Sequence, residues 1–369
     1  MNSMETETPL IQELGYVLSQ IDQLASPPTL RAIALEILTS PDIMKGLLQA
    51  TLAQIHPGGL ILVHCRPKVL RKRLGSRQVI IYRLILLNEA GPKTRSVELV
   101  GKRYADGAEG ERAFGLMQQL WEGGFGEGSR FKIPKPLCYL PDFKLLIQER
   151  AHGALLPKYL GRGDDAALAR ARMVARWLAK LHQLETMPAG IDACADDETS
   201  VHDFAYQLGE RHPHLAPQLE ELAAAICARI AFPDGLALTM VHGDFHPENI
   251  FVTQDRVTVI DFDNVCRSDP ARDLGYIIAQ TRAMVYFSTG LLEAADREIR
   301  AFLQAYLAAA TSHDGRTLPA RIAAFAARAC LANMYYIACV LKTECMEVLS
   351  TLLMEMERFM RAEKVENLI

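Results

Sequence analysis

One stretch constrains the fold of this chain more than any other, because its turns are marked by residues with few conformational choices. It covers residues 241–263 and reads VHGDFHPENIFVTQDRVTVIDFD. Gly243 and Pro247 interrupt any helix across its first part, so this part is expected to be a loop. Apolar runs at 250–252 and 257–260 flank a polar turn. This pattern predicts a β-hairpin after the loop.

Four polar side chains of this stretch are expected to share one site. Asp244 and Asn249 lie five residues apart on the loop, and the second strand is expected to end in Asp261 and Asp263. An i, i+2 pair on a strand shares one face, and the hairpin is expected to bring Asn249 back towards Asp261. A loop carboxylate acting as base, with Asn and Asp oxygens around a hard cation, suits Mg²⁺-assisted phosphoryl transfer. The alternative is a hairpin whose acids only cap turns.

The same residues resemble a known pair of motifs. HGDFHPEN at 242–249 and IDFD at 260–263 match H-G-D-x-x-x-x-N and I-D-[FW]-[DEG] of the aminoglycoside phosphotransferase and choline kinase-like superfamily, distant relatives of protein kinases. The resemblance implies that Asp244 is the catalytic base. It also implies that Asn249 and Asp261 bind Mg²⁺, and Asp263 matches a frequent second acid. The implied phosphoryl donor is ATP, with GTP as the alternative.

The resemblance extends over about residues 60–345 and implies an α+β, protein kinase-like fold of two lobes. We expect a small N-lobe with an antiparallel sheet at 58–150 and a mostly helical C-lobe, which carries the catalytic and metal-binding loops, at 151–369. Residues 1–57 have helical periodicity and form an extra N-terminal extension. This extension is expected to pack on the N-lobe, to lengthen it, or to join two subunits as a homodimer.

Three segments rich in β-branched and aromatic residues predict the N-lobe sheet, at 60–65, 78–87 and 97–104. Eleven Lys or Arg and only two acids lie between Arg66 and Tyr104. A nucleic-acid surface is one interpretation of this basic strip. A sheet face around an anionic nucleotide is the simpler one, since no basic motif interleaved with aromatic residues is present.

The resemblance also implies nucleotide-binding residues in the N-lobe. Lys102, in the last of these strands, matches the ATP-binding lysine. Glu111 lies near the start of the next predicted helix, where kinases hold the glutamate that orients this lysine, with Glu109 as the alternative. Main-chain groups from Glu149 to Ala151 match the interlobe hinge and would bind adenine. The sequence has no G-x-G-x-x-G in this lobe, so the residues that cover the phosphates are not identified.

The short stretch of sequence between Asp261 and Asp273 favours a small molecule as the acceptor. No activation segment of protein-kinase length fits between them, so the predicted acceptor is a hydroxyl group of a small molecule, either a metabolite or an antibiotic. Acids at 192–198, in a predicted loop at 187–200, would suit a polycationic aminoglycoside without requiring one. By the resemblance, Asp273 braces the catalytic loop. The alternatives to an enzyme are a nucleotide-binding pseudokinase and a regulatory binding protein.

Composition favours a cytoplasmic protein without nucleic-acid or membrane partners. The net charge is −4, the N-terminus is acidic without an apolar core, and the strongly apolar run at 329–341 is too short to span a bilayer. The eight cysteines include no C-x-x-C, which argues against a disulfide framework. The histidines at 202, 212 and 214 lack the spacing of a zinc site.

Overall fold

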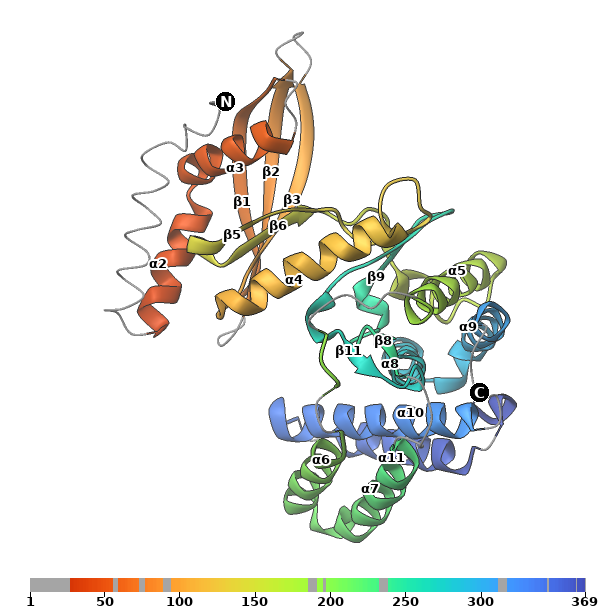
Figure 1. Cartoon of the computed structure of the whole chain (residues 1–369). Coiled ribbons are helices and arrows are strands. Elements are labelled where there is room, and N and C mark those ends of the chain that lie inside the picture. Colours follow the sequence, from red (N-terminus) through yellow and green to blue (C-terminus); the bar gives the residue numbers. More distant parts are fainter. Residues whose placement is uncertain are drawn as a thin grey trace. The chain divides into compact units, whose positions relative to one another are not determined.

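The computed structural model divides the chain into two compact units, which correspond to the two lobes (Figure 1). Unit 1, the N-lobe, contains Met1–Gly128 and Ile133–Ala151, and unit 2, the C-lobe, contains Ser129–Lys132 and His152–Ile369. The structure describes residues 27–55, 59–72, 77–88, 94–184, 191–194, 197–231, 238–310, 317–343, 345–362 and 364–368.

An antiparallel sheet forms the centre of the N-lobe, as predicted. Its order is β1-β2-β3-β6-β5, and each neighbouring pair is antiparallel. The strands are β1 Leu60–Lys72, β2 Gln78–Asn88, β3 Thr94–Arg103, β5 Pro136–Leu140 and β6 Leu145–Glu149. Strand β1 continues well beyond its predicted end, because its basic second half still pairs with β2.

Two N-terminal helices, α2 Pro27–Thr39 and α3 Pro41–Ile55, pack on this sheet and share its core. The Gln49 side chain on α3 bonds two main-chain groups of β1, at 2.9 and 2.5 Å. The Tyr82 hydroxyl donates to the carbonyl oxygen of Leu38 at 3.1 Å. The predicted helical extension is therefore confirmed for its described part, and residues 1–26 lie outside the described residues. The homodimer through these helices stays a prediction.

Helix α4, Gly107–Leu120, follows β3 and confirms the helix predicted there. Asp106 caps it, since its carboxylate accepts the N–H of Ala108 at 3.0 Å. Met117 and Leu120 are buried on the same stripe of the helix. The amphipathic pattern of the sequence is thus the pattern of burial.

The C-lobe is mostly helical, as predicted, with small sheets at its catalytic loop. One sheet has the order β4-β10-β9-β7, and β8 pairs with β11. Its helices are α5 Asp165–His182, α6 Asp197–Arg211, α7 Ala216–Ile230, α8 Ala271–Thr289, α9 Asp296–Ala309, α10 Leu318–Tyr335 and α11 Met346–Arg361. Its strands are β4 Phe131–Lys132, β7 Ala154–Leu155, β8 Thr239–Val241, β9 Ile250–Val252, β10 Val257–Val259 and β11 Cys266–Ser268.

The predicted loop at 187–200 is wrong over residues 197–200, and residues 187–190 and 195–196 lie outside the described residues. Asp197 starts helix α6, and its carboxylate forms ion pairs with Arg272 and, at 2.7 Å, with Arg328. Tertiary ion pairs of this kind cannot be read from the local sequence. The acid at 197 is therefore neutralised by arginines of α8 and α10.

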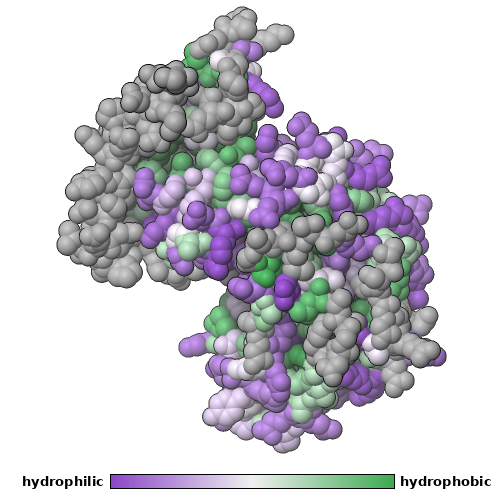
Figure 2. All heavy atoms as spheres, viewed as in Figure 1, coloured by the Kyte–Doolittle hydropathy of each residue, from purple (hydrophilic) through white to green (hydrophobic). Residues whose placement is uncertain are grey.

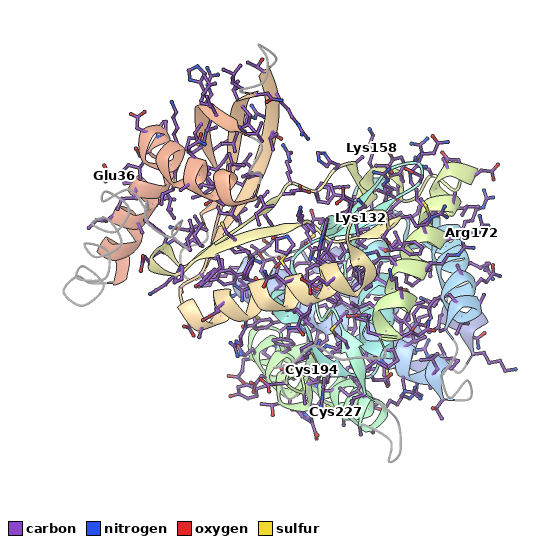
Figure 3. The ribbon with its side chains drawn as sticks, turned by 45° about the horizontal axis from the view of Figure 1, so that its top comes forward. Glu36, Lys132, Lys158, Arg172, Cys194 and Cys227 are labelled. Atoms are coloured by element: carbon purple, nitrogen blue, oxygen red, sulfur yellow. A yellow bond between two sulfur atoms is a disulfide. The ribbon has the colours of Figure 1, made fainter. Side chains whose placement is uncertain are left out.

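The expectation of no disulfide is also wrong. Cys194, which is labelled in Figure 3, bonds Cys266 with a sulfur–sulfur distance of 2.04 Å, and 72 residues separate the two cysteines in the sequence. The Arg267 N–H donates to Asp192 O at 2.8 Å, which holds the two segments side by side. Such a pairing has no C-x-x-C signature because it depends on the tertiary fold.

Helix α10 is a core helix. With the π-helical turn η8, Tyr336–Val340, it forms a segment, Leu318–Val340, that is long and apolar enough to cross a membrane by length and composition. In the most apolar 18-residue stretch of this segment, 61% is buried within the structure. On the face drawn in Figure 2, the described residues are mostly hydrophilic, with apolar patches scattered among them. The apolar character of α10 is explained by its packing in the C-lobe.

Helices α8 and α10 approach closely at Gly275. A Cβ atom at this position would lie 2.6 Å from the Ala326 nitrogen and 2.6 Å from the Ile322 carbonyl oxygen. Both are main-chain atoms of a buried helix and cannot move aside independently. Only glycine fits the crossing of the two helices.

Gly275→Ala is expected to lower the free energy of unfolding by about 1–3 kcal/mol, the usual cost of overpacking a core. Gly115→Ala on α4 is the matched control, because a Cβ there meets nothing within 4 Å. The control is expected to raise stability by about 0.5–1 kcal/mol. Urea denaturation followed by circular dichroism measures both. Wild-type stability in Gly275→Ala would show that the helices can separate without cost.

Candidate active site

The predicted loop and hairpin are both present. In the hairpin, Val252 pairs with Val257 and Ile250 pairs with Val259. The N–H of the next residue, Ile260, donates to the main-chain oxygen of Asn249 at 3.0 Å. The hairpin therefore returns Asn249 to the residue immediately before Asp261, as the sequence predicted.

The predicted strand face shared by Asp261 and Asp263 is wrong. Strand β10 ends at Val259, and Asp261 has left-handed backbone angles of φ 71° and ψ 66°. The 3-10 turn η6, Phe262–Asn264, follows directly. The i, i+2 rule requires extended backbone, and the turn at Asp261 removes it. Asp261 and Asp263 thus leave the hairpin from a tight turn.

The Asp273 carboxylate holds the catalytic loop in place through hydrogen bonds to its main chain. It accepts main-chain N–H groups of His242 at 2.7 Å and Gly243 at 2.9 Å, and lies 3.1 Å from Nε2 of His182. Burial raises the pKa of Asp273, but the hydrogen bonds and the charge of His182 outweigh it and hold this pKa below its usual range. Burial raises the pKa of Tyr306, so its hydroxyl stays protonated, and it lies 2.8 Å from Nδ1 of His182. Asp273 thus contacts three polar groups, as its predicted bracing role requires, and Tyr306 contacts one of them, His182.

Gly243 is required by the sharp turn before Asp244. Its φ is 78°, and a Cβ atom there would lie 2.0 Å from the main-chain oxygen of Asn264. No side chain fits this approach. Gly243 therefore allows close contact between the catalytic loop and the turn that carries Asp261 and Asp263.

His242 joins the loop to the hairpin, a role that the sequence analysis missed. Burial lowers its pKa, so the ring is neutral. Its Nδ1 accepts the N–H of Asp244 at 3.3 Å, and its Nε2 donates to the main-chain oxygen of Ile260 at 3.1 Å. The ring lies among the aromatic rings of Trp177, Phe245 and Phe262. His242 thus ties together the two segments that carry the acids.

Asp244 is ionised and partly open to solvent, with 25% of its side chain exposed. Burial raises its pKa, but His246 outweighs that effect and holds the pKa below its usual range. Nε2 of His246 lies 3.7 Å from Oδ2 of Asp244, and Nδ1 accepts the N–H of Glu248. Nε2 is therefore the ring nitrogen that faces the carboxylate. The negative charge of Asp261 acts in the opposite direction, which shows that this acid lies near Asp244.

Asn249 and Tyr276 complete the surroundings of Asp244. Asn249 is buried at the end of the 3-10 turn η5, Pro247–Asn249, and its Nδ2 donates to Asp244 O at 3.0 Å and to Oδ2 at 3.4 Å. Its carbonyl oxygen Oδ1 is therefore the atom that could ligate a cation. Burial and the Asp244 charge raise the pKa of Tyr276, so its hydroxyl stays protonated beside the carboxylate. Tyr276 was also missed, although it follows Asp273 by three residues on α8.

The carboxylate of Asp261 and the carbonyl oxygen of Asn249 are hard donors. Oxygen donors are what Mg²⁺ prefers, so the residues present fit this cation. Asp263 lies in the turn after Asp261. The hairpin thus brings Asn249 and Asp261, two of the predicted metal-binding residues, to its open end.

The predicted nucleotide residues of the N-lobe lie on β3, α4 and the end of β6. Lys102 is opposite Val79 in the sheet, and its Nζ lies 5.6 Å from the centroid of the Tyr104 ring. Glu111 is exposed on α4. Glu109, the alternative, forms an ion pair with Arg77. The roles of Lys102 and Glu111 stay predictions.

The predicted hinge begins where β6 ends. The Glu149 N–H donates to Lys135 O at 2.9 Å, and the Arg150 N–H donates to Glu98 O at 3.3 Å. Both amides are thus used within the N-lobe. The other main-chain groups from Glu149 to Ala151 are left to test for adenine binding.

A separate set of metal-type ligands lies on α6 and α7. One ligand atom from each of Glu198, His202 and Cys227 lies within 4.8 Å of the others. His212 and His214, which were considered together with His202 from the sequence, do not belong to this group. Two of its three members are exposed, so nothing in their burial requires a metal.

Asp273→Asn is expected to lower the free energy of unfolding at pH 7 by about 1–3 kcal/mol, because an amide cannot accept all the donors that meet there. A pKa lowered by folding gives stability that is present above the unfolded value of about 3.9 and is lost as pH falls through the folded value. The variant is therefore expected to lose less stability than wild type below about pH 4. Urea titrations at several pH values measure this, with the exposed Asp255→Asn as control. Parallel pH curves for Asp273→Asn and wild type would contradict the bracing role.

Comparison with known proteins places this geometry in a family. The profile described as "Phosphotransferase enzyme family" matches residues 87–325. No curated protein sequence matches the chain.

Similar solved structures show the same fold. The ethanolamine kinase of Plasmodium vivax is 13% identical with a TM-score of 0.54, and 96% of each chain is covered. A choline/ethanolamine kinase family protein of Mesorhizobium loti is 15% identical with a TM-score of 0.51, covering 88% of this chain and 97% of that one. A spectinomycin phosphotransferase, solved with ADP and spectinomycin, is 12% identical with a TM-score of 0.53, covering 89% and 97%. With its kinase-like fold and a family match over more than half of its length, the chain belongs to the phosphotransferase enzyme family.

Proposed function

We propose that this phosphotransferase moves the γ-phosphoryl group of Mg-ATP to a hydroxyl group of a small molecule, with Asp244 as the base. The observation that carries the proposal is the state of Asp244. It is an ionised, partly exposed carboxylate on a loop that Asp273 fixes through main-chain hydrogen bonds. Such a group is positioned to accept a proton from an acceptor hydroxyl.

In the proposed step, the acceptor oxygen attacks the γ-phosphorus while the bond from that phosphorus to the β,γ-bridging oxygen breaks. The hydroxyl proton passes to Asp244, and ADP leaves with the bond's electron pair. The transition state of such transfers is loose, so positioning and charge stabilisation matter more than the strength of the base. A carboxylate with a low pKa is sufficient for this role.

Asn249 and Asp261 are the residues that would hold Mg²⁺, with Asp263 as the further acid. When bound, Mg²⁺ neutralises phosphate charge and orients the phosphates. The support for this assignment is the hairpin register, which returns Asn249 to the residue before Asp261. The oxygen donors of all three side chains are those of magnesium sites in general.

The nucleotide is proposed to be ATP, with GTP as the alternative, and to bind through N-lobe groups. Lys102 would contact the phosphates, and Glu111 would orient Lys102. Main-chain groups from Glu149 to Ala151 other than the two paired amides would bind the base. The similar spectinomycin phosphotransferase was solved with ADP. A cytoplasmic location, where ATP and Mg²⁺ are available, is part of the same proposal.

The acceptor need not be a polycation. Asp197, from the acidic run that would suit an aminoglycoside, is paired with Arg272 and Arg328. Because these arginines neutralise the charge of Asp197, its carboxylate is less able to bind an amine of the acceptor. Among the similar structures, some carry names of amino alcohol kinases and others the name of an antibiotic kinase. A phosphorylation screen over hydroxylated metabolites and antibiotics identifies the acceptor.

Asp244→Asn is expected to reduce acceptor phosphorylation by about 10²–10⁴-fold. This corresponds to about 3–5 kcal/mol of transition-state stabilisation. The near-identical size of Asn should preserve the melting temperature and ATP affinity. The three quantities are measured on one preparation, beside the exposed Asp255→Asn. Full turnover in Asp244→Asn would refute the catalytic role, and joint loss of folding and ATP binding would indicate a structural one.

Asp261→Asn is expected to remove most of the Mg²⁺ dependence of nucleotide affinity, because an amide replaces a charged oxygen ligand. Asn is the appropriate replacement since it tolerates the left-handed backbone found at Asp261. Asp263→Asn should have a smaller effect. Calorimetric titration with ATP, with and without Mg²⁺, compares the variants. Equal Mg²⁺ dependence in wild type and Asp261→Asn would remove Asp261 from the metal site.

A further inference from the structure

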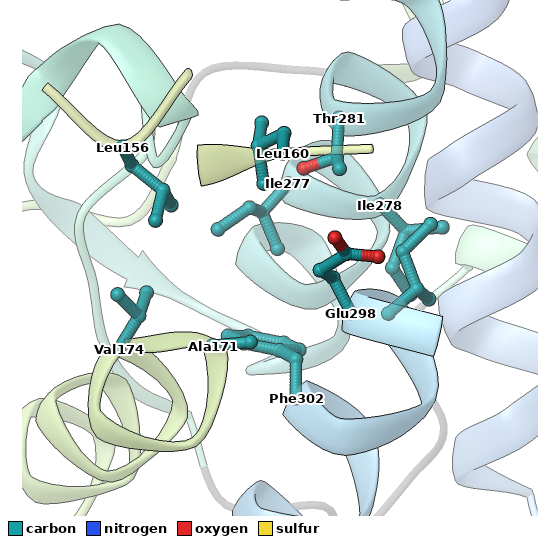
Figure 4. Close-up of a pocket in the computed structure, with 10 residues that line it drawn as sticks. Leu156, Leu160, Ala171, Val174, Ile277, Ile278, Thr281, Glu298 and Phe302 are labelled. Atoms are coloured by element: carbon teal, nitrogen blue, oxygen red, sulfur yellow. The ribbon is translucent and has the colours of Figure 1, made fainter. Parts of the chain in front are cut away.

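An apolar pocket of the C-lobe lies between the 3-10 turn η3, Leu156–Tyr159, and helices α5, α8 and α9 (Figure 4). Its walls are almost wholly aliphatic and aromatic, and Glu298 is the acid among its lining residues. This carboxylate is buried and accepts the N–H of Gly163 at 2.8 Å, so it holds the segment before α5 in place. A set of side chains with ligand chemistry lies instead between α6 and α7.

Three side chains of these two helices converge. Glu198 and His202 are four residues apart on α6, so they project from the same face of that helix. Cys227 lies near the end of α7. A carboxylate oxygen, a ring nitrogen and the sulfur, one atom from each residue, all lie within 4.8 Å of one another. The two helices thus bring three different kinds of donor atom together.

The sulfur of Cys227 is the buried member of the set. Only 8% of the surface of Cys227 is exposed, and its Sγ lies 4.0 Å from the main-chain oxygen of Glu198. Glu198 and His202 are exposed. The three residues therefore combine a sulfur that the packing of α7 against α6 fixes with a carboxylate and an imidazole that an ion can reach from solvent.

The donor atoms suit zinc. Thiolate, imidazole and carboxylate are the three protein ligands of Zn²⁺, whereas Mg²⁺ and Ca²⁺ take oxygen ligands. Around a tetrahedral Zn²⁺ with bonds of about 2.0–2.3 Å, the ligand atoms lie about 3.3–3.8 Å apart. Atoms within 4.8 Å of one another would have to approach by up to about 1.5 Å. Rotation of the exposed Glu198 and His202 side chains between rotamers can supply this movement.

A cation beside the sulfur supports a thiolate there. Burial lowers the pKa of Arg328 on α10, and negative charge on Asp197 and on the sulfur of Cys227 acts in the opposite direction. The Arg328 guanidinium therefore lies near this sulfur. Cysteines that bind metals as thiolates have electropositive surroundings of this kind.

We propose that Glu198, His202 and Cys227 bind a zinc ion, with a water molecule as the fourth ligand. Cys227 would bind as the thiolate and release its proton to solvent, and His202 would bind as the neutral imidazole. The ion would join α6 to α7 at the first turns of α6, where Asp197 pairs with the arginines of α8 and α10. The site is separate from Asp244 and does not depend on phosphotransfer.

The first test is a titration of the full chain with Co²⁺, followed by absorption spectroscopy in the presence of excess Mg²⁺. Co²⁺ adopts the geometry of zinc sites, and a thiolate bound to it gives a charge-transfer band in the near ultraviolet. Mg²⁺ occupies sites made only of oxygen ligands, which do not give this band. We expect the band to saturate at one ion per chain and to disappear when Zn²⁺ is added, because Zn²⁺ binds such sites more tightly than Co²⁺.

The second test compares ligand variants with matched controls. Cys227→Ser is expected to remove the charge-transfer band. His202→Ala changes an exposed residue and is expected to weaken Zn²⁺ by more than about 10–100-fold, the loss caused by removing even a group behind a ligand. Cys339→Ser, at a partly exposed cysteine, and His214→Ala, at an exposed histidine between the two helices, should leave the band and the Zn²⁺ affinity unchanged.

Three results would overturn the proposal. The first is the absence of a charge-transfer band in the wild type. The second is an unchanged band in Cys227→Ser, which would assign the sulfur to another cysteine. The third is an unchanged Zn²⁺ affinity in both His202→Ala and Glu198→Gln, which test the site even where Cys227→Ser does not fold. None of these results bears on Asp244, so the proposed function is tested separately.

Discussion

The catalytic loop depends on one buried carboxylate. Asp273 accepts main-chain hydrogen bonds from His242 and Gly243 at 2.7 and 2.9 Å. His182 lies 3.1 Å from the same carboxylate, and Tyr306 contacts the other nitrogen of the His182 ring. The loop could not keep a sharp left-handed turn at Gly243 without such a partner, because its buried N–H groups would lack acceptors. The position of Asp244 therefore follows from a residue that does not take part in the proposed chemistry.

The surroundings of Asp244 suit positioning better than strong basicity. Many general bases have a pKa near the working pH, whereas His246 holds the pKa of Asp244 below its usual range. A loose phosphoryl transfer transition state requires little proton removal before the phosphorus–oxygen bond breaks. The geometry around Asp244, with Asn249 on one oxygen and Tyr276 nearby, agrees with this requirement.

Much of the fold and of the C-lobe site could be predicted because the signals are local. Gly243, Pro247 and two apolar runs define the loop and hairpin within 23 residues. Segments rich in β-branched and aromatic residues predicted the N-lobe sheet, and helical periodicity predicted the described N-terminal helices. The helical C-lobe followed from the resemblance that the motifs carry. The roles of His242, His246 and Tyr276 were missed, since they depend on which groups the fold brings beside Asp244.

The sequence by itself therefore determined the order of elements, the family and the residues that carry the proposed chemistry. The tertiary structure alone decided the left-handed turn at Asp261, the disulfide between Cys194 and Cys266, and the arginine partners of Asp197. The physical reason is the range in sequence over which each effect acts. Backbone preference and hydrophobic period act over a few residues, whereas these features arise where segments distant in sequence pack together.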